Sequence, residues 1–208
     1  MEKTIESYNV INRSVDMGNT NFLMIKHSQM EGERIILRPV SLDDVGDMYE
    51  YTSDEETTRY IYDQHKDINQ TKKMIANYYM KSPIGMYAIV LKESNKMIGT
   101  IEFRIHEWNN SGELGFTLNR HFWGKGYMTE AGKLILELAF HTLGLDRVFS
   151  GHDVRNGASG KVLSRLGMTY EGTHRRDQMV KGVLTDTAHY SILKDEYLNS
   201  GKKGRIIG

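Results

Sequence analysis

The chain has 208 residues, with 27 basic and 27 acidic side chains, a formal net charge of zero and no cysteine. This length suits one domain with a substantial hydrophobic core, and the composition is that of an ordinary globular protein. The absence of cysteine excludes disulfides, thiolate zinc sites, iron–sulfur clusters and cysteine nucleophiles. The neutral balance also argues against a direct nucleic-acid partner, which usually meets a net basic surface.

The N-terminal segment 1–32 is polar and weakly patterned. We expect an arm or irregular extension there, which in a homodimer would pack on the partner subunit. It has no apolar stretch behind a basic start, so no secretory signal is expected, and no apolar run is long enough to cross a bilayer. We therefore expect a cytoplasmic protein with no membrane partner. One domain is expected over 33–199, followed by a basic tail at 200–208.

The first half of the predicted domain combines strands and two helices. Ser41 is a good helix N-cap, and the acidic residues in the turn after it favour a helix to about Thr52. Apolar residues at helical spacing predict a second helix, which stops before Pro83. A turn at 93–96 between two apolar runs predicts an antiparallel hairpin. The predicted elements are a strand at 33–40, helices at 41–52 and 69–81, and strands at 86–91, 97–105 and 113–118.

The second half places a long helix between two strands. From Ala131, apolar residues recur at i, i+3, i+4 and i+7, which predicts an amphipathic helix that ends at Gly144. A further helix is predicted from Asn156, as N-cap, to Gly167. Strands are predicted at 147–152, 168–174 and 185–193. The pattern predicts an α+β fold with a central mixed, mostly antiparallel sheet flanked by helices, and with one strand–helix–strand crossover.

Gly124-Lys125-Gly126 stands between a predicted strand and the long helix. The glycines allow a tight turn, and the free N–H groups of a helix N-terminus attract anions, so the segment favours phosphate binding. The alternative is a tight turn with no ligand. A Walker A loop is excluded because Gly126 follows Lys125 where Ser or Thr is required, and Thr129 stands at the third glycine of a dinucleotide fingerprint. A nucleotide-binding domain is therefore disfavoured.

With its flanking residues, the segment 123–131 resembles the acetyl-CoA pyrophosphate loop of the GNAT superfamily of N-acetyltransferases, whose pattern is Q/R-x-x-G-x-G/A. Trp123 stands at the Q/R position and Met128 at the last small position. More narrowly, Asn156-x-x-Ser159, Leu166-Gly167-Met168 and Glu171-Gly172 are similar to the Rim-type branch, which acetylates the N-termini of ribosomal proteins. The resemblance covers about residues 34–197.

The resemblance implies a GNAT-like acyl-CoA N-acyltransferase fold and direct transfer of acetyl from acetyl-CoA to a primary amine. The acceptor would be a protein N-terminal amine, as in ribosomal proteins, or a small amine such as an antibiotic or polyamine. No metal is expected, and the histidines contain no HxxxH pair. The residues implied to bind acetyl-CoA are Phe116, Thr117, Leu118, Trp123, Gly124, Lys125, Gly126, Tyr127, Met128, Thr129, Asn156 and Ser159.

The same resemblance implies Glu113 as the general base, with Glu102 on the neighbouring strand in reserve, and Ser159 as the group that protonates the leaving thiolate. A backbone N–H near 115–118 would stabilise the oxyanion, and Gly115 would suit a β-bulge. The alternative for Glu113 is a solvated strand-edge carboxylate. Leu163 replaces a tyrosine acid of a sister group, and Gln178 replaces a glutamate proposed as base in some Rim-type enzymes. A catalytically silent acyl-CoA-binding module is therefore the alternative function.

The zero net charge conceals two segments of opposite sign. Residues 31–67 contain 4 basic and 11 acidic side chains, whereas residues 120–176 contain 9 basic and 5 acidic ones. Under the resemblance, the acidic segment would lie on the acceptor side and the basic one on the cofactor side. Tyr49, Tyr51, Tyr60 and Tyr62 are candidates for lining an acceptor pocket, with ordinary packing as the alternative.

Overall fold

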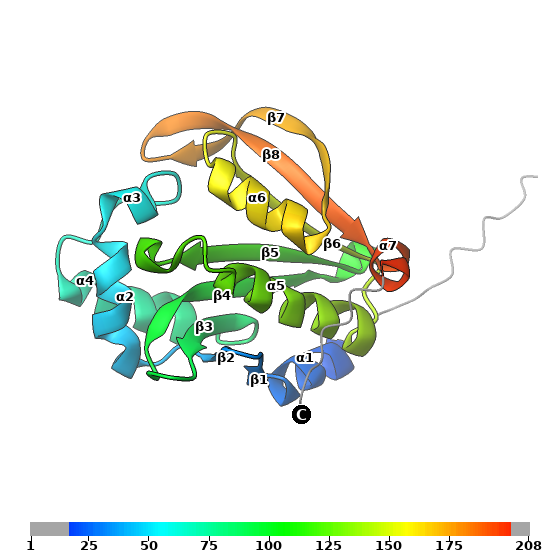
Figure 1. Cartoon of the computed structure of the whole chain (residues 1–208), viewed down its shortest axis with the longest axis horizontal. Helices are drawn as coiled ribbons and strands as arrows, with labels where there is room; N and C mark the ends of the chain where they lie inside the picture. The colour runs from blue at the N-terminus through cyan, green and yellow to red at the C-terminus, as the bar shows by residue number, and fades with distance from the viewer. Residues whose placement is uncertain (1–16, 201–208) are drawn as a thin grey trace, which may run out of the picture.

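The computed structural model describes residues 17–200, in which a central sheet has helices on both faces (Figure 1). Within this range the sheet has eight strands in the order β1-β2-β3-β4-β5-β6-β8-β7. Neighbouring strands are antiparallel, except that β5 and β6 are parallel. The strands are β1 (Met30–Glu31), β2 (Ile35–Pro39), β3 (Met86–Leu91), β4 (Met97–His106), β5 (Ser111–Leu118), β6 (Arg147–Asp153), β7 (Thr169–Val180) and β8 (Val183–Leu193).

Two of the helices, α4 and α5, continue directly into π-helical segments, η2 and η5. The α-helices are α1 (Met17–Lys26), α2 (Val45–Thr52), α3 (Glu55–Thr58), α4 (Ile68–Met74), α5 (Tyr127–Glu137), α6 (Gly157–Leu166) and α7 (Lys194–Asn199). The π-helical segments are η2 (Ile75–Met80) and η5 (Leu138–Thr142), and the 3-10 turns are η1 (Leu42–Asp44), η3 (Glu107–Asn109) and η4 (Arg120–Phe122). None of the helices in residues 17–200 has the length and apolar character that crossing a membrane requires.

Capping residues set several of these boundaries as the sequence predicts. Ser41 accepts a hydrogen bond from the Asp43 N–H, and Asp44 accepts one from the Ser41 N–H, so the two form a capping box. Asn156 caps α6 by accepting from the Ser159 N–H at 3.3 Å. Gly167 ends the same helix with a left-handed φ of 91°. The predicted crossover is also confirmed, because α5 and η5 connect the parallel strands β5 and β6.

Two hydrophobic cores lie on opposite faces of the sheet. The larger core takes side chains from α5, α6, α1 and α7, and the smaller one takes them from α2 and η2. Successive residues of β3 alternate between them, with Ile89 in the larger core and Val90 in the smaller. The α+β fold with helices on both faces is therefore as predicted.

The structure differs from the sequence-based expectation at both ends of the chain. Residues 17–31, predicted as part of an irregular arm, contain α1 and β1, and Met24 of α1 is buried in the larger core. This part of the expected arm is therefore regular in structure and packs against the rest of the domain. The rest of the predicted arm, residues 1–16, and the basic tail after Ser200 lie outside the described residues. The sequence pattern predicts neither α3 nor α7, and the strand that it predicts at 168–174 is shorter than β7.

The sheet opens between its two parallel strands. β5 and β6 pair only where residues 111–113 face residues 147–149. Beyond that point β5 stays with β4 as far as Leu118, while β6 stays with β8 as far as Asp153. β5 pairs with β4 in regular register through Gly115, so the expected bulge at Gly115 is absent. The fold thus creates a gap in the hydrogen-bond ladder at the C-terminal end of β5.

Candidate active site

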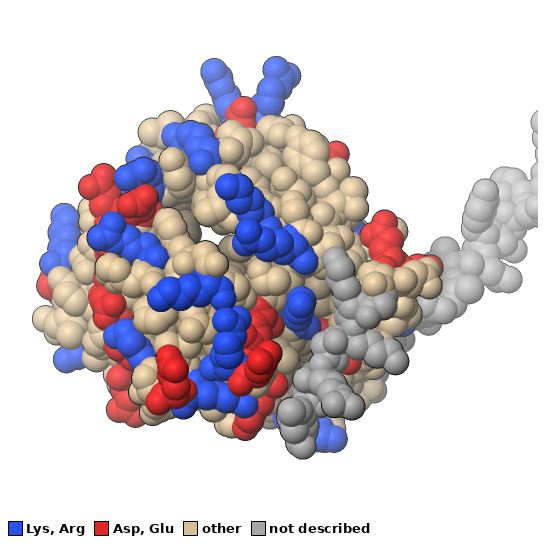
Figure 2. Space-filling view, viewed as in Figure 1, with Lys and Arg blue, Asp and Glu red and all other residues tan. Residues whose placement is uncertain are grey.

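A cavity of about 480 Å³ lies where β5 and β6 have separated. Four segments line it: the end of β5, the loop into α5 with its first turn, the first turns of α6, and residues 56–61. Figure 2 shows Lys and Arg side chains gathered around a hollow on this face. All the residues expected to bind acetyl-CoA line the cavity, except Lys125. The basic residues that line it are Arg59, Arg155, Lys161 and Arg165.

The loop before α5 presents uncapped backbone N–H groups to this cavity. Gly124 and Gly126 have φ values of +74° and +84°, in the left-handed region that glycine adopts without steric cost. Gly126 is the N-cap of α5, and no side chain caps this end of the helix. The N–H groups of the first turn and the positive end of the helix dipole therefore remain available to an anion.

Arg34, immediately before β2, holds this loop in place. Its Nε donates to Glu130 Oε2 at 2.8 Å, and its Nη1 donates to the Lys125 carbonyl at 2.9 Å. The guanidinium also lies 4.5 Å from the centroid of the Tyr127 ring. Sequence reasoning missed Arg34, because 96 positions separate it from Glu130 and no local pattern links them.

The N-terminal part of α6 forms the opposite wall. Ser159 lines the cavity, and its hydroxyl forms no hydrogen bond with any residue in 17–200. Arg155 binds Asp153 with a closest distance of 2.6 Å, and its hydrogen bonds lower the pKa of the buried Asp153 carboxyl although burial opposes the shift. Lys161 and Arg165 follow at four-residue spacing along α6. A four-residue spacing of basic residues on a helix places them on one face, so this pattern in the sequence indicates a basic face of α6.

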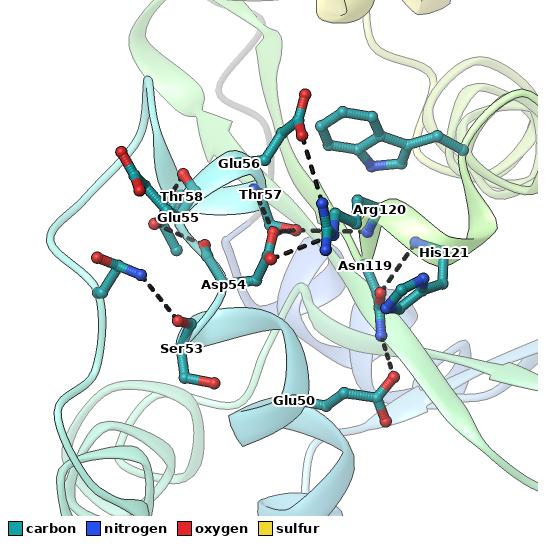
Figure 3. A network of polar contacts seen from close by, with 12 residues as sticks. Glu50, Ser53, Asp54, Glu55, Glu56, Thr57, Thr58, Asn119, Arg120 and His121 are labelled. Carbon is teal, nitrogen blue, oxygen red and sulfur yellow. Dashed lines mark hydrogen bonds and ion pairs between the residues drawn. The ribbon is translucent and has the colours of Figure 1, made fainter.

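Arg120, at the start of η4, connects this site to the acidic segment of the chain (Figure 3). The Arg120 guanidinium lies 3.1 Å from the Asp54 carboxylate and 3.4 Å from that of Glu56. The Arg120 backbone N–H donates to the Thr57 hydroxyl at 3.4 Å. Burial raises the pKa of Asp54, but hydrogen bonds from Thr57 and the charge of Arg120 outweigh it and lower the pKa. These contacts fix residues 54–57 beside the loop that leads into α5.

A second set of contacts neutralises more of the acidic segment. Lys96 pairs with Asp47 at 2.7 Å and with Glu50 at 2.8 Å. Asn119 also donates to Glu50, at 2.9 Å (Figure 3), and the hydrogen bonds from Lys96 and Asn119 lower the pKa of Glu50. The acidic segment is therefore not a free negative face. The charge pattern predicts that the acidic segment lies on the acceptor side. Residues 56–61 of this segment also line the cavity, so the segment is not confined to one side.

The two candidate base residues lie on the face of the sheet away from α5, which they share with Thr117 of the cavity lining. Leu114 and Phe116 pack in the core beside α5, so Glu113 on the same strand points to the opposite face. Glu113 Oε2 lies 3.1 Å from His106 Nε2, and 38% of the Glu113 side chain is exposed. Neither Glu113 nor Glu102 is among the residues that line the cavity.

Glu102 is more enclosed than Glu113, with only 14% of its side chain exposed. It accepts hydrogen bonds from the Tyr78 hydroxyl at 2.8 Å and the Tyr79 hydroxyl at 3.4 Å, and it pairs with Arg104. Burial raises the pKa of Tyr62, whose hydroxyl lies near Thr117 and near the negative charge of Glu102. Tyr62 is thus close both to Glu102 and to Thr117, a strand residue that lines the cavity.

The expected tyrosine cluster separates into different environments. Tyr51 is buried in the smaller core, and Tyr60 lines the cavity, with Arg155 5.4 Å from its ring centroid. Tyr49 donates to the Lys66 carbonyl at 3.4 Å. Only Tyr62 lies near a candidate base.

The sequence model described as "Acetyltransferase (GNAT) domain" matches residues 34–169. "Uncharacterized N-acetyltransferase p20" of Bacillus licheniformis is 33% identical over 170 residues, which cover 79% of this chain and 96% of that protein. "Putative ribosomal N-acetyltransferase YdaF" of Bacillus subtilis is 36% identical over 89 residues, or 43% of this chain and 49% of that protein. A GCN5-related N-acetyltransferase from Brucella melitensis has a similar fold, with a TM-score of 0.75 and 24% identity over 82% of this chain and 80% of that one. The chain belongs to the GNAT family of N-acetyltransferases.

Proposed function

We propose that this N-acetyltransferase binds acetyl-CoA in the cavity between β5, α5 and α6. The observation that carries the proposal is the convergence of the uncapped N-terminus of α5 and the unpaired edge of β5 on one cavity. The uncapped N-terminus of α5 suits a pyrophosphate. Basic side chains such as Arg155 and Lys161 suit further phosphate, and apolar ones such as Phe116 and Val162 suit an aliphatic arm.

Acetyl-CoA supplies an electrophilic thioester carbonyl and a thiolate leaving group. The amine nitrogen would form the new bond to the carbonyl carbon as the carbon–sulfur bond breaks. Past Glu113, β5 has no strand partner on its β6 side, and although the Leu114 carbonyl accepts from Ser150, a backbone N–H of 115–118 would meet the thioester oxygen. The free hydroxyl of Ser159 would give a proton to the departing sulfur, and a carboxylate would take the proton that the amine loses.

Glu113 and Glu102 are the two candidates for that carboxylate. Glu113 matches the family position, but it is more exposed and pairs with His106. Glu102 is more enclosed and lies near Tyr62, although its carboxylate is already paired with Arg104. Substitution of each by glutamine distinguishes them.

We propose a protein N-terminal amine as the acceptor. The Rim-type motifs and the similarity to YdaF over 89 residues support this class. The face that carries Glu113 is also open, since His106 and Glu113 are each about one-third exposed and Trp108 nearby is 85% exposed. An open face accepts a chain end that continues into a protein, whereas a small amine is usually held in an enclosed site. Antibiotics and polyamines remain the alternative acceptors.

Ligand binding and turnover test the proposal separately. CoA, but neither ATP nor NAD, is expected to raise the melting temperature of the purified chain. Thiol release from acetyl-CoA is then measured with panels of peptides and of small amines, and the peptides are expected to be acetylated faster. Stabilisation by CoA without turnover on any amine would identify a silent acyl-CoA-binding module instead. Stabilisation by ATP or NAD but not by CoA would contradict the assignment of the cavity.

A Ser159→Ala variant tests the proton donor. We expect kcat to fall by about tenfold or more while KM for acetyl-CoA changes little, because the hydroxyl acts on the leaving group. Ser164→Ala, on the same helix, is the matched control: the Ser164 hydroxyl donates to the Gly160 carbonyl and does not line the cavity. Equal activity of the two variants would remove Ser159 from the chemistry.

A further inference from the structure

Three side chains of the β7–β8 hairpin converge away from the cavity. Asp177 Oδ2 lies 3.2 Å from His189 Nε2 and 3.7 Å from His174 Nδ1. One potential ligand atom from each of the three residues lies within 4.8 Å of the other two. None of the three lines the cavity. We propose that His174, Asp177 and His189 bind one divalent transition-metal ion of the zinc type.

The distances suit such an ion. Zinc binds imidazole nitrogen and carboxylate oxygen at about 2.0–2.2 Å, so two ligand atoms of a tetrahedral site lie about 3.3–3.6 Å apart. The two distances to Asp177 Oδ2, 3.2 and 3.7 Å, bracket this range. The two imidazole nitrogens lie within 4.8 Å of each other, so the side chains would close around the ion to complete three of the four ligand positions, and water would take the fourth.

The ligand types define the class of metal. Two imidazoles and one carboxylate suit Zn²⁺, Co²⁺, Ni²⁺ and Cu²⁺, whereas Mg²⁺ and Ca²⁺ prefer oxygen ligands alone. Asp177 and His189 now share a hydrogen bond, so the metal would take the place of that proton. Because both imidazoles must be neutral, affinity is expected to fall as the pH drops below the usual histidine pKa of about 6.5.

The backbone of β7 is irregular at this place. In a regular strand, His174 and Asp177 would point to opposite faces, because they are three residues apart. The register between β7 and β8 shifts between His174 and Gln178, and Arg176 has a left-handed φ of +52°. The Arg176 N–H donates to Asp186 at 2.8 Å, which fixes the irregular segment to β8. This irregularity brings the carboxylate to the two imidazoles and thereby forms the site.

The neighbouring charges allow a metal-free alternative. Arg175 and Arg176 flank the cluster on β7 and disfavour a further cation, whereas the carboxylate of Glu171, which pairs with Arg147, lies close to His189. The alternative is a cluster in which protonated histidines pair with Asp177. Such a cluster strengthens as the pH falls, whereas metal binding weakens, so the two are separable.

The test uses the full chain without a histidine tag, after treatment with a chelator. Calorimetric titration with ZnCl₂ at pH 7.5 is expected to show one ion per chain. The melting temperature is expected to rise by about 5 °C when free zinc exceeds its Kd a hundredfold. Co²⁺ is expected to give the visible absorption of a tetrahedral site.

Variants assign the site to these residues. His189→Asn and Asp177→Asn are expected to weaken zinc binding more than tenfold and to abolish the thermal shift. His141→Asn is the matched control, since His141 also lies beside a carboxylate, 3.8 Å from Glu137, but belongs to no three-ligand group in residues 17–200. His174→Asn serves as a further variant least prone to disturb folding, because 64% of that side chain is exposed.

Two results would overturn the proposal. One is unchanged zinc affinity in His189→Asn, Asp177→Asn and His174→Asn. The other is no zinc binding by the unmodified chain at pH 7.5. The circular dichroism and melting temperature of each metal-free variant establish that it is folded.

Discussion

Arg34 and Glu130 form an ion pair at 2.8 Å although 96 positions separate them in the chain. The Glu130 carboxylate also accepts a hydrogen bond from the Arg34 backbone N–H, so it binds both the backbone and the side chain of Arg34. The pair ties the start of β2 to the first turn of α5. Since the Arg34 guanidinium also binds the Lys125 carbonyl, the conformation of the loop before α5 depends on a residue outside that loop.

Replacing Arg34 by alanine should therefore weaken acetyl-CoA binding more than it slows chemistry. We expect KM for acetyl-CoA to rise about tenfold, equivalent to about 1.4 kcal/mol, while kcat stays within about twofold. Steady-state kinetics at saturating acceptor measure both. Lys92→Ala, which removes another partly exposed ion pair, to Glu31, is the control and should leave both constants unchanged. An unaltered KM in the Arg34 variant would show that the loop holds its shape without the clamp.

One substitution at two glycines should have opposite effects. Gly126→Ala forces a side chain into the left-handed region, at φ +84°, and is expected to cost about 1–2 kcal/mol and to weaken CoA binding. Gly46 lies within α2, and a Cβ there would meet nothing within 4 Å. Gly46→Ala should raise stability by about 0.4–1 kcal/mol with normal CoA binding. Chemical unfolding and CoA titration check both variants, and a fully functional Gly126→Ala would contradict the role given to the loop geometry.

Glutamine variants at positions 102 and 113 should identify the base. The variant that removes it is expected to lower kcat/KM most at low pH, because at high pH the free-amine form of an α-amino acceptor, with a pKa of about 8, needs no assistance. Rates measured from pH 6 to pH 9 therefore reveal a deficit that shrinks as the pH rises. The variant at the other position should give a constant ratio to the unmodified enzyme. If both ratios are independent of pH, neither carboxylate accepts the proton.

Asp54 should make folding stability depend on pH. Its pKa is lowered in the folded state, so its contribution is present above the unfolded pKa of about 3.9 and is lost as the pH falls through the folded value. Asp54→Asn keeps a good helix cap but loses the charge that faces Arg120, and we expect it to be about 1 kcal/mol less stable at pH 7.

Urea unfolding at pH 7 and at successively lower pH measures this difference, which should shrink below about pH 4. Asp63→Asn, at an exposed aspartate, is the control and should match the unmodified protein throughout. A difference that persists undiminished at pH 3 would mean that the hydrogen-bonding shape of the side chain, and not its charge, stabilises the segment.

Local chemistry explains which parts of the fold the sequence could predict. Asn156 and Gly167 define α6 through interactions within a few residues, so a capping pattern suffices. β7 is different, because nearly all its side chains are exposed and no apolar alternation marks its length. α1 was missed for a similar reason: its apolar residues, such as the exposed Phe22 and Ile25, do not follow one helix face, although Met24 reaches the core.

Local chemistry also explains which parts of the candidate site the sequence could predict. The loop at 124–126 is a contiguous motif, and the sequence analysis placed it at the start of the correct helix. The contacts of Arg34, the proximity of Tyr62 to Glu102 and Thr117, and the His174–Asp177–His189 cluster all depend on distant or irregular pairing. Alternation along β5 predicts the face on which Glu113 lies, but it contains no information about the distance between Glu113 and the cavity.

The short junction between β5 and β6 makes the sheet a jointed structure of two blocks, β1–β5 and β6–β8. Three residue pairs, the hydrogen bond from the Ser150 hydroxyl to the Leu114 carbonyl and those between Asn110 and Asp146 connect the blocks, and side chains of both blocks pack in the larger core. Close packing transmits displacement rather than absorbing it. A molecule bound in the cavity would press on α6, and through α6 on the β7–β8 hairpin beside it, which supplies none of the cavity lining. Binding of a molecule in the cavity should therefore displace β7 and β8.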